Sequence, residues 1–329
     1  MSADPASFTW DDAGRTVHFG AGALEKAPEA EFELFTTPRA LADAERIGAS
    51  AAAVHEVAPG GVPDAAGALL DRGSAPTIVA LGGGRVIETA KAVAAIEGQR
   101  VVAIPTTLSG AEMTAIHRLP AGAEERARGM VRPQVVLADP QLMTGQPEDQ
   151  LRASAMNALA HGADSLYTPF ANPVSTMTAL RGAELIGNAL DQERRDRDRA
   201  ALALGAILCG YAIDSGKFAL HHVICQTLVR ELGIPHAETN AAILPQAMAF
   251  MRERAAEQIG ALAQALGTDP ASLPNRIAEL GRPSGLGALG AERDRLEAAL
   301  DAIEARPDLA HTPRPPDREE LKGIIEAAW

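Results

Sequence analysis

The sequence predicts a two-domain protein with an α/β first half and an all-helical second half. Short apolar runs alternate with alanine-rich helical stretches up to residue 146, and such alternation is typical of a parallel sheet with helices on both faces. From residue 147 onward only helical patterns remain. The length of 329 residues also corresponds to about two domains of ordinary size. We therefore expect domains at residues 1–146 and 147–329.

Three apolar runs in the first half are expected to be strands. Residues 77–81 are followed by three glycines, residues 100–104 by a proline, and residues 134–138 by Asp-Pro. Residues 86–96 lie between the first two runs and carry apolar side chains at three- and four-residue spacing, which predicts a helix. An earlier strand is expected to end at Thr37.

The second half has the pattern of successive helices separated by short Gly, Pro and Asp segments. The charged segment 191–199 is interpreted as a solvated helix end or loop, and the proline-rich segment 312–316 as a connector to the last helix. The predicted helices cover residues 151–166, 175–190, 199–213, 218–232, 243–266 and 318–329.

Composition narrows the class of protein. The formal charge of −13 argues against a nucleic-acid or anionic-membrane surface, because phosphate binding needs clustered Lys and Arg. The two cysteines, Cys209 and Cys225, form no disulfide framework and fit a reducing cytoplasm. No signal peptide is recognisable, and the most apolar stretch, residues 200–213, is too short to span a membrane. We expect a soluble cytoplasmic protein.

A glycine turn at Gly82, Gly83 and Gly84 separates a predicted strand from a predicted helix. Backbone N–H groups at such a helix start bind phosphate, and glycine permits close approach of the ligand. The spacing is not the G-x-G-x-x-G of the ordinary dinucleotide fingerprint, so a tight turn without a ligand is the alternative. Arg85 follows and points either to a phosphate or to solvent.

A second polar segment, residues 105–114, follows the next predicted strand. It carries four hydroxyls, from Thr106, Thr107, Ser109 and Thr114. Ligands of open α/β sheets bind at the carboxyl ends of the strands, so these hydroxyls are candidates to bind a diphosphate, a ribose or a carboxamide. The alternative is that they cap a helix.

Histidines in the second half form a candidate metal or substrate site. Asn157 and His161 are four residues apart on a predicted helix and share one face. His222 and His236 lie on later segments, and together these side chains could surround Zn²⁺ or Fe²⁺. The alternative is that each is an ordinary core or surface residue. That alternative is taken for His18, His55, His117 and His311, and His221 is less well spaced than His222.

Taken together, these motifs resemble the iron-containing alcohol dehydrogenase superfamily, and specifically its maleylacetate reductase branch. The similarity extends over nearly the whole length. The matching segments are residues 17–24, 82–84, 90–91, 104–114, 139–140, 156–161, 166–167, 171–173, 222, 235–239 and 244–245.

The resemblance implies a Rossmann-like dinucleotide-binding domain and an all-helical domain, together the dehydroquinate synthase-like fold. It implies NADH or NADPH as cofactor. In the wider superfamily an Asp and three His hold a divalent metal, Fe or Zn, and those places fall here on Asn157, His161, His222 and His236. The asparagine is typical of the maleylacetate reductase branch. Residues carried over to the cofactor site are Thr37, Gly82, Gly83, Gly84, Arg85, Lys91, Thr106, Thr107, Ser109 and Thr114.

Three positions depart from the family pattern. Arg85 stands where the family has serine, and Gln226 and Asn240 stand where histidines are usual. Neither amide donates a proton as an imidazolium does. The candidate catalytic set is therefore His161, His222, His236, Asn157, Gln226 and Asn240.

The leading hypothesis is an NAD(P)H-dependent reductase. It would reduce the C=C bond of maleylacetate, or act on a related anionic oxo acid, in aromatic-ring degradation. The departures keep two alternatives open: a non-redox enzyme on the same fold, catalysing cyclisation, condensation or elimination, and a catalytically silent binding protein. A homodimer is expected from the resemblance.

Overall fold

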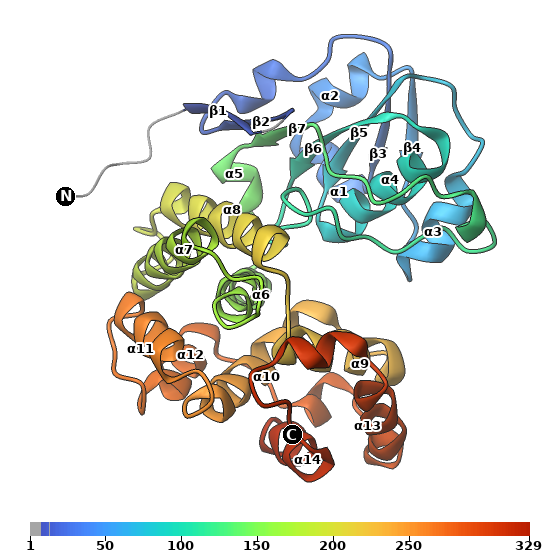
Figure 1. Cartoon of the computed structure of the whole chain (residues 1–329). Helices are drawn as coiled ribbons and strands as arrows, with labels where there is room; N and C mark the ends of the chain where they lie inside the picture. The colour runs from blue at the N-terminus through green and yellow to red at the C-terminus, as the bar shows by residue number, and fades with distance from the viewer. Residues whose placement is uncertain (1–7, 13) are drawn as a thin grey trace. The chain divides into compact units, whose positions relative to one another are not determined.

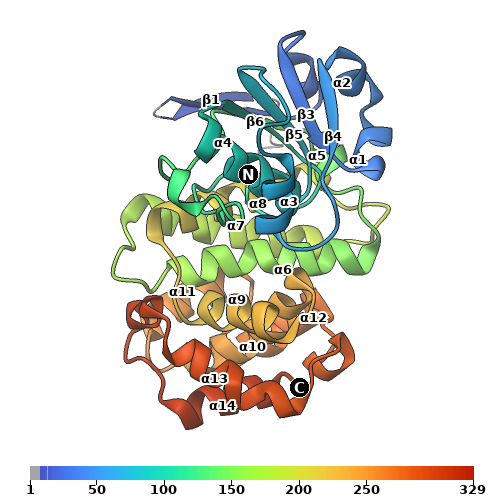
Figure 2. The same ribbon diagram turned by 90° about the vertical axis from the view of Figure 1, so that its right-hand side faces the viewer.

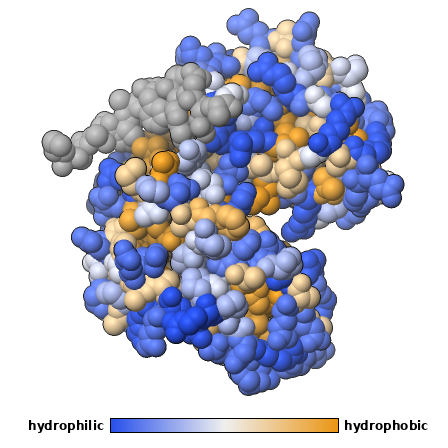
Figure 3. Space-filling view, in the orientation of Figure 1, coloured by the Kyte–Doolittle hydropathy of each residue, from blue (hydrophilic) through white to orange (hydrophobic). Residues whose placement is uncertain are grey.

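The computed structural model describes residues 8–12 and 14–329, and the chain divides into two compact units (Figure 1). The first unit contains the chain up to Gln146 together with Arg199–Leu204, and the second contains Pro147–Asp198 and Gly205–Trp329. On the face shown in Figure 3, hydrophilic residues dominate the surface of each unit, in keeping with the net charge of −13. No single helix in the described part of the chain is long and apolar enough to cross a membrane.

The first unit is built on a seven-stranded sheet with the strand order β1-β2-β7-β6-β5-β3-β4. All neighbouring strands are parallel except β1 and β2, which run antiparallel. Only two residues separate β1 from β2, and so short a connection permits only an antiparallel pair. The strands are β1 (Phe8–Asp12), β2 (Arg15–Phe19), β3 (Phe32–Thr36), β4 (Ala53–Glu56), β5 (Thr77–Gly82), β6 (Arg100–Pro105) and β7 (Val135–Ala138). The three strands predicted from apolar runs are thus confirmed as β5, β6 and β7.

The strand order places a topological switch point between β3 and β5. From β3 the chain crosses to β4 on one side, and from β5 it crosses to β6 on the other side. In open α/β sheets, ligands bind outside the carboxyl ends of the strands at such a point. The glycine turn follows β5 and Thr37 follows β3, so both predicted cofactor segments lie at this position.

Helices cover both faces of the sheet, as predicted. On one face α3 (Val62–Leu69) and α4 (Gly84–Glu97) pack on Ile78 and Ala80 of β5. On the other face α1 (Pro38–Asp43) and α2 (Glu45–Ser50) pack on Val79 and Leu81. Alternate residues of one strand therefore enter opposite cores, which explains why β5 is apolar throughout. The helix predicted at residues 86–96 is α4.

The second unit is all-helical and is arranged around α6 (Glu148–Ser165), which is seen end-on in Figure 1 and lengthwise in Figure 2. Every residue of α6 from Leu151 to Ser165 is buried. The helix nevertheless carries polar side chains, and buried polar groups need partners or a function. The other helices are α7 (Pro173–Asp191), α8 (Arg199–Gly216), α9 (Leu220–Leu232), α10 (His236–Met251), α11 (Ala256–Ala265), α12 (Leu273–Gly281), α13 (Leu296–Glu304) and α14 (Arg318–Ala327). The first six residues of α8, Arg199–Leu204, belong to the first unit.

The prediction of one helix over residues 243–266 is wrong, because α10 and α11 occupy this region and α10 begins earlier, at His236. The turn between them is held by distant partners. Arg314 donates to the carbonyl of Glu253, and Arg254 pairs with Glu320. The periodicity of residues 243–266 could not predict this break, because the contacts that hold the turn are made with residues far along the chain.

The charged segment 191–199 is only partly solvated, so that interpretation needs a correction. Arg197 is buried and forms two hydrogen bonds to Glu148, at 2.8 and 2.9 Å. Arg152 of α6 also pairs with Glu148, at 2.7 Å. This network holds the start of α6 to the segment that precedes α8.

Candidate functional site

The glycine turn and the hydroxyl-bearing loop contact each other at the switch point. A Cβ placed on Gly83 would lie 2.9 Å from Cγ2 of Thr107, and one on Gly84 would lie 3.0 Å from Cβ of Ser109. Gly83 is the N-cap of α4 and supplies no side-chain cap. The first N–H groups of α4 therefore receive no bond from an N-cap side chain, and such N–H groups suit an anionic phosphate. These features fit a dinucleotide.

Several of the predicted cofactor residues have partners within the protein. The Thr37 hydroxyl accepts from the N–H of Ala40 at 3.3 Å and caps α1. Arg85 donates from Nη1 to the carbonyl of Ala58 at 2.7 Å. The Thr107 hydroxyl, in contrast, is a buried oxygen with no partner in the described residues. Among the candidate hydroxyls, Thr107 therefore has the strongest geometric case for contacting a ligand.

Lys91 lies beneath the loop. Its side chain is completely buried, and Nζ donates to the carbonyls of Ala111 at 2.8 Å, Thr114 at 3.0 Å and Ile116 at 2.8 Å. Lys91 and Thr114 therefore shape the loop from inside, and any part they take in cofactor binding is indirect. No helix follows the loop before residue 124, so the helix-capping alternative for its hydroxyls does not apply.

Glu112 is a residue that the sequence analysis missed. It is wholly buried, and neither carboxylate oxygen has a hydrogen-bond partner in the described part of the chain. Burial raises the pKa of Glu112 to about 7, while the nearby charges of Lys91 and Arg15 oppose that rise. An acid inside a ligand loop could have been noticed in the sequence, but its burial could not.

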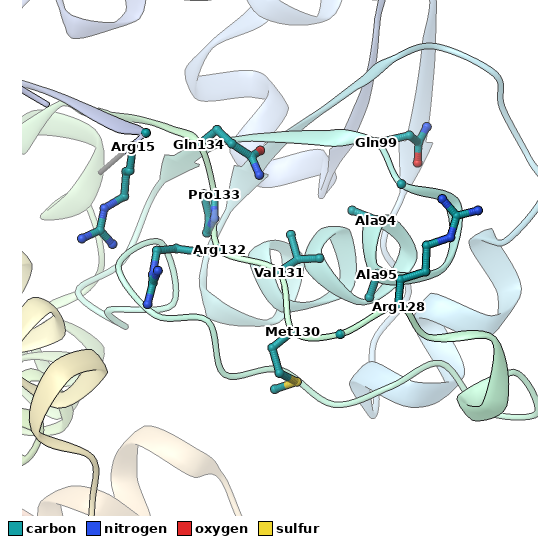
Figure 4. Close-up of a pocket in the computed structure, with 13 residues that line it drawn as sticks. Arg15, Ala94, Ala95, Gln99, Arg128, Met130, Val131, Arg132, Pro133 and Gln134 are labelled. Atoms are coloured by element: carbon teal, nitrogen blue, oxygen red, sulfur yellow. The ribbon is translucent and has the colours of Figure 1, made fainter. Parts of the chain in front are cut away.

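A cavity of about 370 Å³ lies at the amino ends of the strands, away from the glycine turn (Figure 4). Arg15, Gln99, Arg128 and Gln134 line it, and no predicted site residue does. The Oε1 atom of Gln134 accepts from the N–H of Val101 at 2.7 Å. Arg15 donates to the carbonyl of Met113 at 2.7 Å. These contacts give the two side chains structural roles.

The second unit contains the histidine site. His161 projects from α6 and His222 from the first turn of α9, and their rings stack with centroids 5.0 Å apart. Asn157 lies one turn before His161 on α6 and is also buried. The structure thus brings together two of the predicted histidines from helices about 60 positions apart in the sequence.

Asp164 organises this site, although the sequence analysis did not select it. Its carboxylate accepts from the backbone N–H groups of Ala219 at 2.9 Å and His222 at 3.2 Å, and from Nδ1 of His222 at 2.9 Å. Tyr167 donates a further hydrogen bond. Burial opposes ionisation, but the hydrogen bond from His222, the nearby His221 and the bond from Tyr167 hold the pKa of Asp164 well below its usual range. Asp164 lies three residues after His161 on the same face, a spacing that could have revealed it.

The bond from Nδ1 of His222 to Asp164 fixes the orientation of this ring. Among the residues that the structure describes, the buried Nε2 of His222 has no hydrogen-bond partner, and neither has the buried Nδ1 of His161. Burial, together with His222 and His236, lowers the pKa of His161 well below its ordinary value. Buried polar atoms are normally satisfied, so two orphaned ring nitrogens side by side indicate a ligand.

Asn240 links the other histidines. Its Oδ1 accepts from Nε2 of His221 at 2.8 Å, and its Nδ2 donates to the carbonyl of His236 at 2.7 Å. Asn240 is completely buried, whereas His236 is exposed at the start of α10. Asn240 therefore connects α9 to the turn that presents His236. These contacts favour a role in positioning the histidines over the predicted catalytic role. Gln226 lies one turn after His222 on α9 and accepts from Arg306.

The donor set fits a divalent metal only in part. Within the residues that the structure describes, no three His, Cys, Asp or Glu side chains are grouped to hold a metal ion. His161 and His222 offer two ring nitrogens, fewer than the three protein ligands typical of catalytic sites. Asp164, the carboxylate of this region, is already engaged by His222 and the start of α9.

Comparison with known proteins agrees with this geometry. Residues 15–140 match the iron-containing alcohol dehydrogenase family, and residues 152–329 match the C-terminal part of the Fe-containing alcohol dehydrogenase family. The chain is 35% identical over 337 residues to the maleylacetate reductase of Burkholderia cepacia, covering 95% of each protein. It is 31% identical to the maleylacetate reductase of a Rhizobium species, covering 98% of this chain and 97% of the relative. The crystal structure of maleylacetate reductase from Agrobacterium tumefaciens has a TM-score of 0.82 at 29% identity and covers 98% of both chains.

The chain belongs to the iron-containing alcohol dehydrogenase family. Within that family it belongs to the maleylacetate reductase branch. Membership implies an NAD(P)H cofactor and, for the family at large, a divalent metal.

Proposed function

We propose that this protein is an NAD(P)H-dependent maleylacetate reductase. The observation that carries the proposal is the stacked pair His161 and His222, with two orphaned nitrogens and with Asp164 behind one ring. The first unit acts as the dinucleotide-binding domain and the second as the substrate domain. No feature of the described residues specifically favours the alternative of a non-redox enzyme.

Reduction of an alkene conjugated to a ketone requires a hydride at one carbon and stabilisation of the charge that develops on the ketone oxygen. When bound, the reduced nicotinamide supplies the hydride. The start of α4 and the Thr107 hydroxyl bind and orient the dinucleotide. In this scheme the backbone of Gly83 and Gly84 allows the pyrophosphate to approach.

His222 is the proposed proton donor. Its Nδ1–H bond to Asp164 orients the ring and holds the Nδ1 proton, as a buried carboxylate does for the histidine of a catalytic triad. A proton on Nε2 would then pass to the ketone oxygen as negative charge arrives there, and the resulting enol tautomerises to the saturated oxo acid. His161, which is neutral because of its lowered pKa, accepts a hydrogen bond or lines the pocket without adding charge.

The test is maleylacetate-dependent oxidation of NADH and of NADPH, followed at the nicotinamide absorbance. We expect turnover with at least one cofactor and a loss of kcat on the order of 100- to 1,000-fold in His222→Gln. His117→Gln is the matched control, because His117 bonds to Arg118 and Val131 in the first unit and should change kcat less than about twofold. Turnover without NAD(P)H consumption would instead support the non-redox alternative.

Two further features belong to this proposal. We infer a homodimer, which sedimentation velocity would test. We also infer a cytoplasmic location, which the two free, buried cysteines Cys209 and Cys225 support.

A further inference from the structure

Arg306 lies beside the histidine site but belongs to a different part of the second unit. It follows α13, and its Nη2 donates to Oε1 of Gln226 at 3.2 Å and to Oδ2 of Asp308 at 3.0 Å. The guanidinium carbon is 6.0 Å from the centre of the Phe218 ring. That ring is in turn 6.0 Å from the ring of His222. Phe218 therefore connects the arginine to the proposed proton donor.

The guanidinium of Arg306 has N–H donors that form no hydrogen bond within the described residues. Both of its hydrogen bonds use Nη2, and within the described residues neither Nε nor Nη1 has a partner. A guanidinium carries five N–H donors in a planar fork that suits a carboxylate. The side chain of Arg306 is 20% exposed, so a ligand can reach it, while most of its surface is removed from water.

The partners of Arg306 orient it without removing all of its charge. Gln226 is a neutral acceptor, and it stands where the resembled family usually has a histidine, which would add a competing positive charge when protonated. Asp308 is 31% exposed, so solvent screens its attraction for the guanidinium. Gln226 lies four residues after His222, a rise of about 6 Å along α9.

We propose that Arg306 binds one carboxylate of a dicarboxylate oxo acid, and that Gln226 is the residue that positions Arg306 for this role. The inference rests on the proposed function, since it assigns a group to the second charge of that substrate. The ordinary alternative is an ion pair with Asp308 that only holds the segment after α13 against α9.

The experiment compares two substrates in Arg306→Gln: maleylacetate, and the monocarboxylate in which a methyl group replaces the CH2–carboxylate arm of the ketone. We expect kcat/KM for maleylacetate to fall about 30- to 100-fold, mainly through KM, because a charge-assisted hydrogen bond is lost. The monocarboxylate should change less than about threefold. Arg306→Lys should recover part of the loss, since it keeps the charge but not the fork.

Arg295→Gln is the matched control, because it removes an exposed arginine of the same unit. It should leave the ratio of the two substrates unchanged. Gln226→Leu should give an intermediate loss confined to the dicarboxylate. An equal fall for both substrates in Arg306→Gln, with a lower Tm, would overturn the proposal in favour of the structural ion pair.

A binding measurement separates this inference from the proposed function. Calorimetric titration with adipate and with hexanoate needs no turnover. We expect the wild-type protein to prefer adipate and Arg306→Gln to lose that preference. Absence of any preference in the wild-type protein would overturn the role of Arg306, whereas a preference without maleylacetate turnover would overturn only the proposed reaction.

Discussion

The two candidate sites of this protein are built in opposite ways. At the switch point of the first unit, ligand groups come from backbone and short loops, and most polar side chains there, such as Thr37 and Arg85, already have protein partners. In the second unit the candidate ligand groups are side chains of distant helices, and two ring nitrogens have no partner in the described part of the chain. The first site is thus shaped mainly by local chain geometry, and the second by tertiary hydrogen bonds that orient a few side chains.

The largest expected effect tests the second half of this comparison. Asp164→Asn keeps the size of the side chain but removes the charge that orients His222, so kcat should fall on the order of 100-fold, and no further than in His222→Gln. Steady-state kinetics and the binding of NADH should be measured together. Affinity for NADH should change less than about threefold, because the dinucleotide site is in the other unit.

Asp269→Asn is the control for that variant, since Asp269 is an exposed acid of the second unit that caps only its own turn. Its kcat should stay within about twofold of the wild-type value. A comparable loss in both variants would mean that Asp164 acts through general stability and not through His222.

A smaller effect is expected at the switch point. Thr107→Val removes the orphaned hydroxyl with little change in volume, and the Kd for NAD(P)H should rise about 5- to 10-fold for one lost hydrogen bond. Thr89→Val removes a buried hydroxyl within α4, which likewise has no partner in the described residues, and serves as the matched control. Calorimetry on both variants tests the assignment. Equal affinities would show that the Thr107 hydroxyl does not contact the cofactor.

The smallest effect concerns how α6 is anchored. Hydrogen bonds from Arg197, together with the charges of Arg197 and Arg152, lower the pKa of Glu148 to about 2 against the opposing effect of partial burial. The folded state therefore gains stability from ionised Glu148 above about pH 4.5, and this gain is lost as the pH falls toward 2. Tm measured across this range should fall less steeply in Glu148→Gln than in the wild-type protein. Parallel curves would contradict the assignment.

The first site was predictable to a large extent. The glycines after an apolar run and the hydroxyls after the next run indicated two loops at one sheet edge, and the contacts of Gly83 with Thr107 and of Gly84 with Ser109 bring those loops together. Lys91 shows the limit of that approach. The sequence placed it in the cofactor site by resemblance, whereas burial places it under the loop.

The sequence indicated some residues of the second candidate site, but neither Asp164 nor the roles of the others. The spacing of Asn157 and His161 and the position of His222 indicated α6 and α9, whose histidine rings stack in the structure. Asp164, Asn240 and Arg306 received their roles from contacts between segments 19 to 80 positions apart. No local pattern records such contacts, because they depend on which helix faces which.

By itself, the sequence determined the α/β and all-helical halves, the carboxyl-edge loops and the family of the protein. These properties depend on hydrophobic periodicity and on motifs of adjacent residues, which are local in the chain. Only the tertiary structure decided which polar groups are satisfied and which remain orphaned. Hydrogen bonding in a core depends on which residues are neighbours in three dimensions. The same residue type therefore binds a ligand, caps a helix or holds two segments together according to what packs against it.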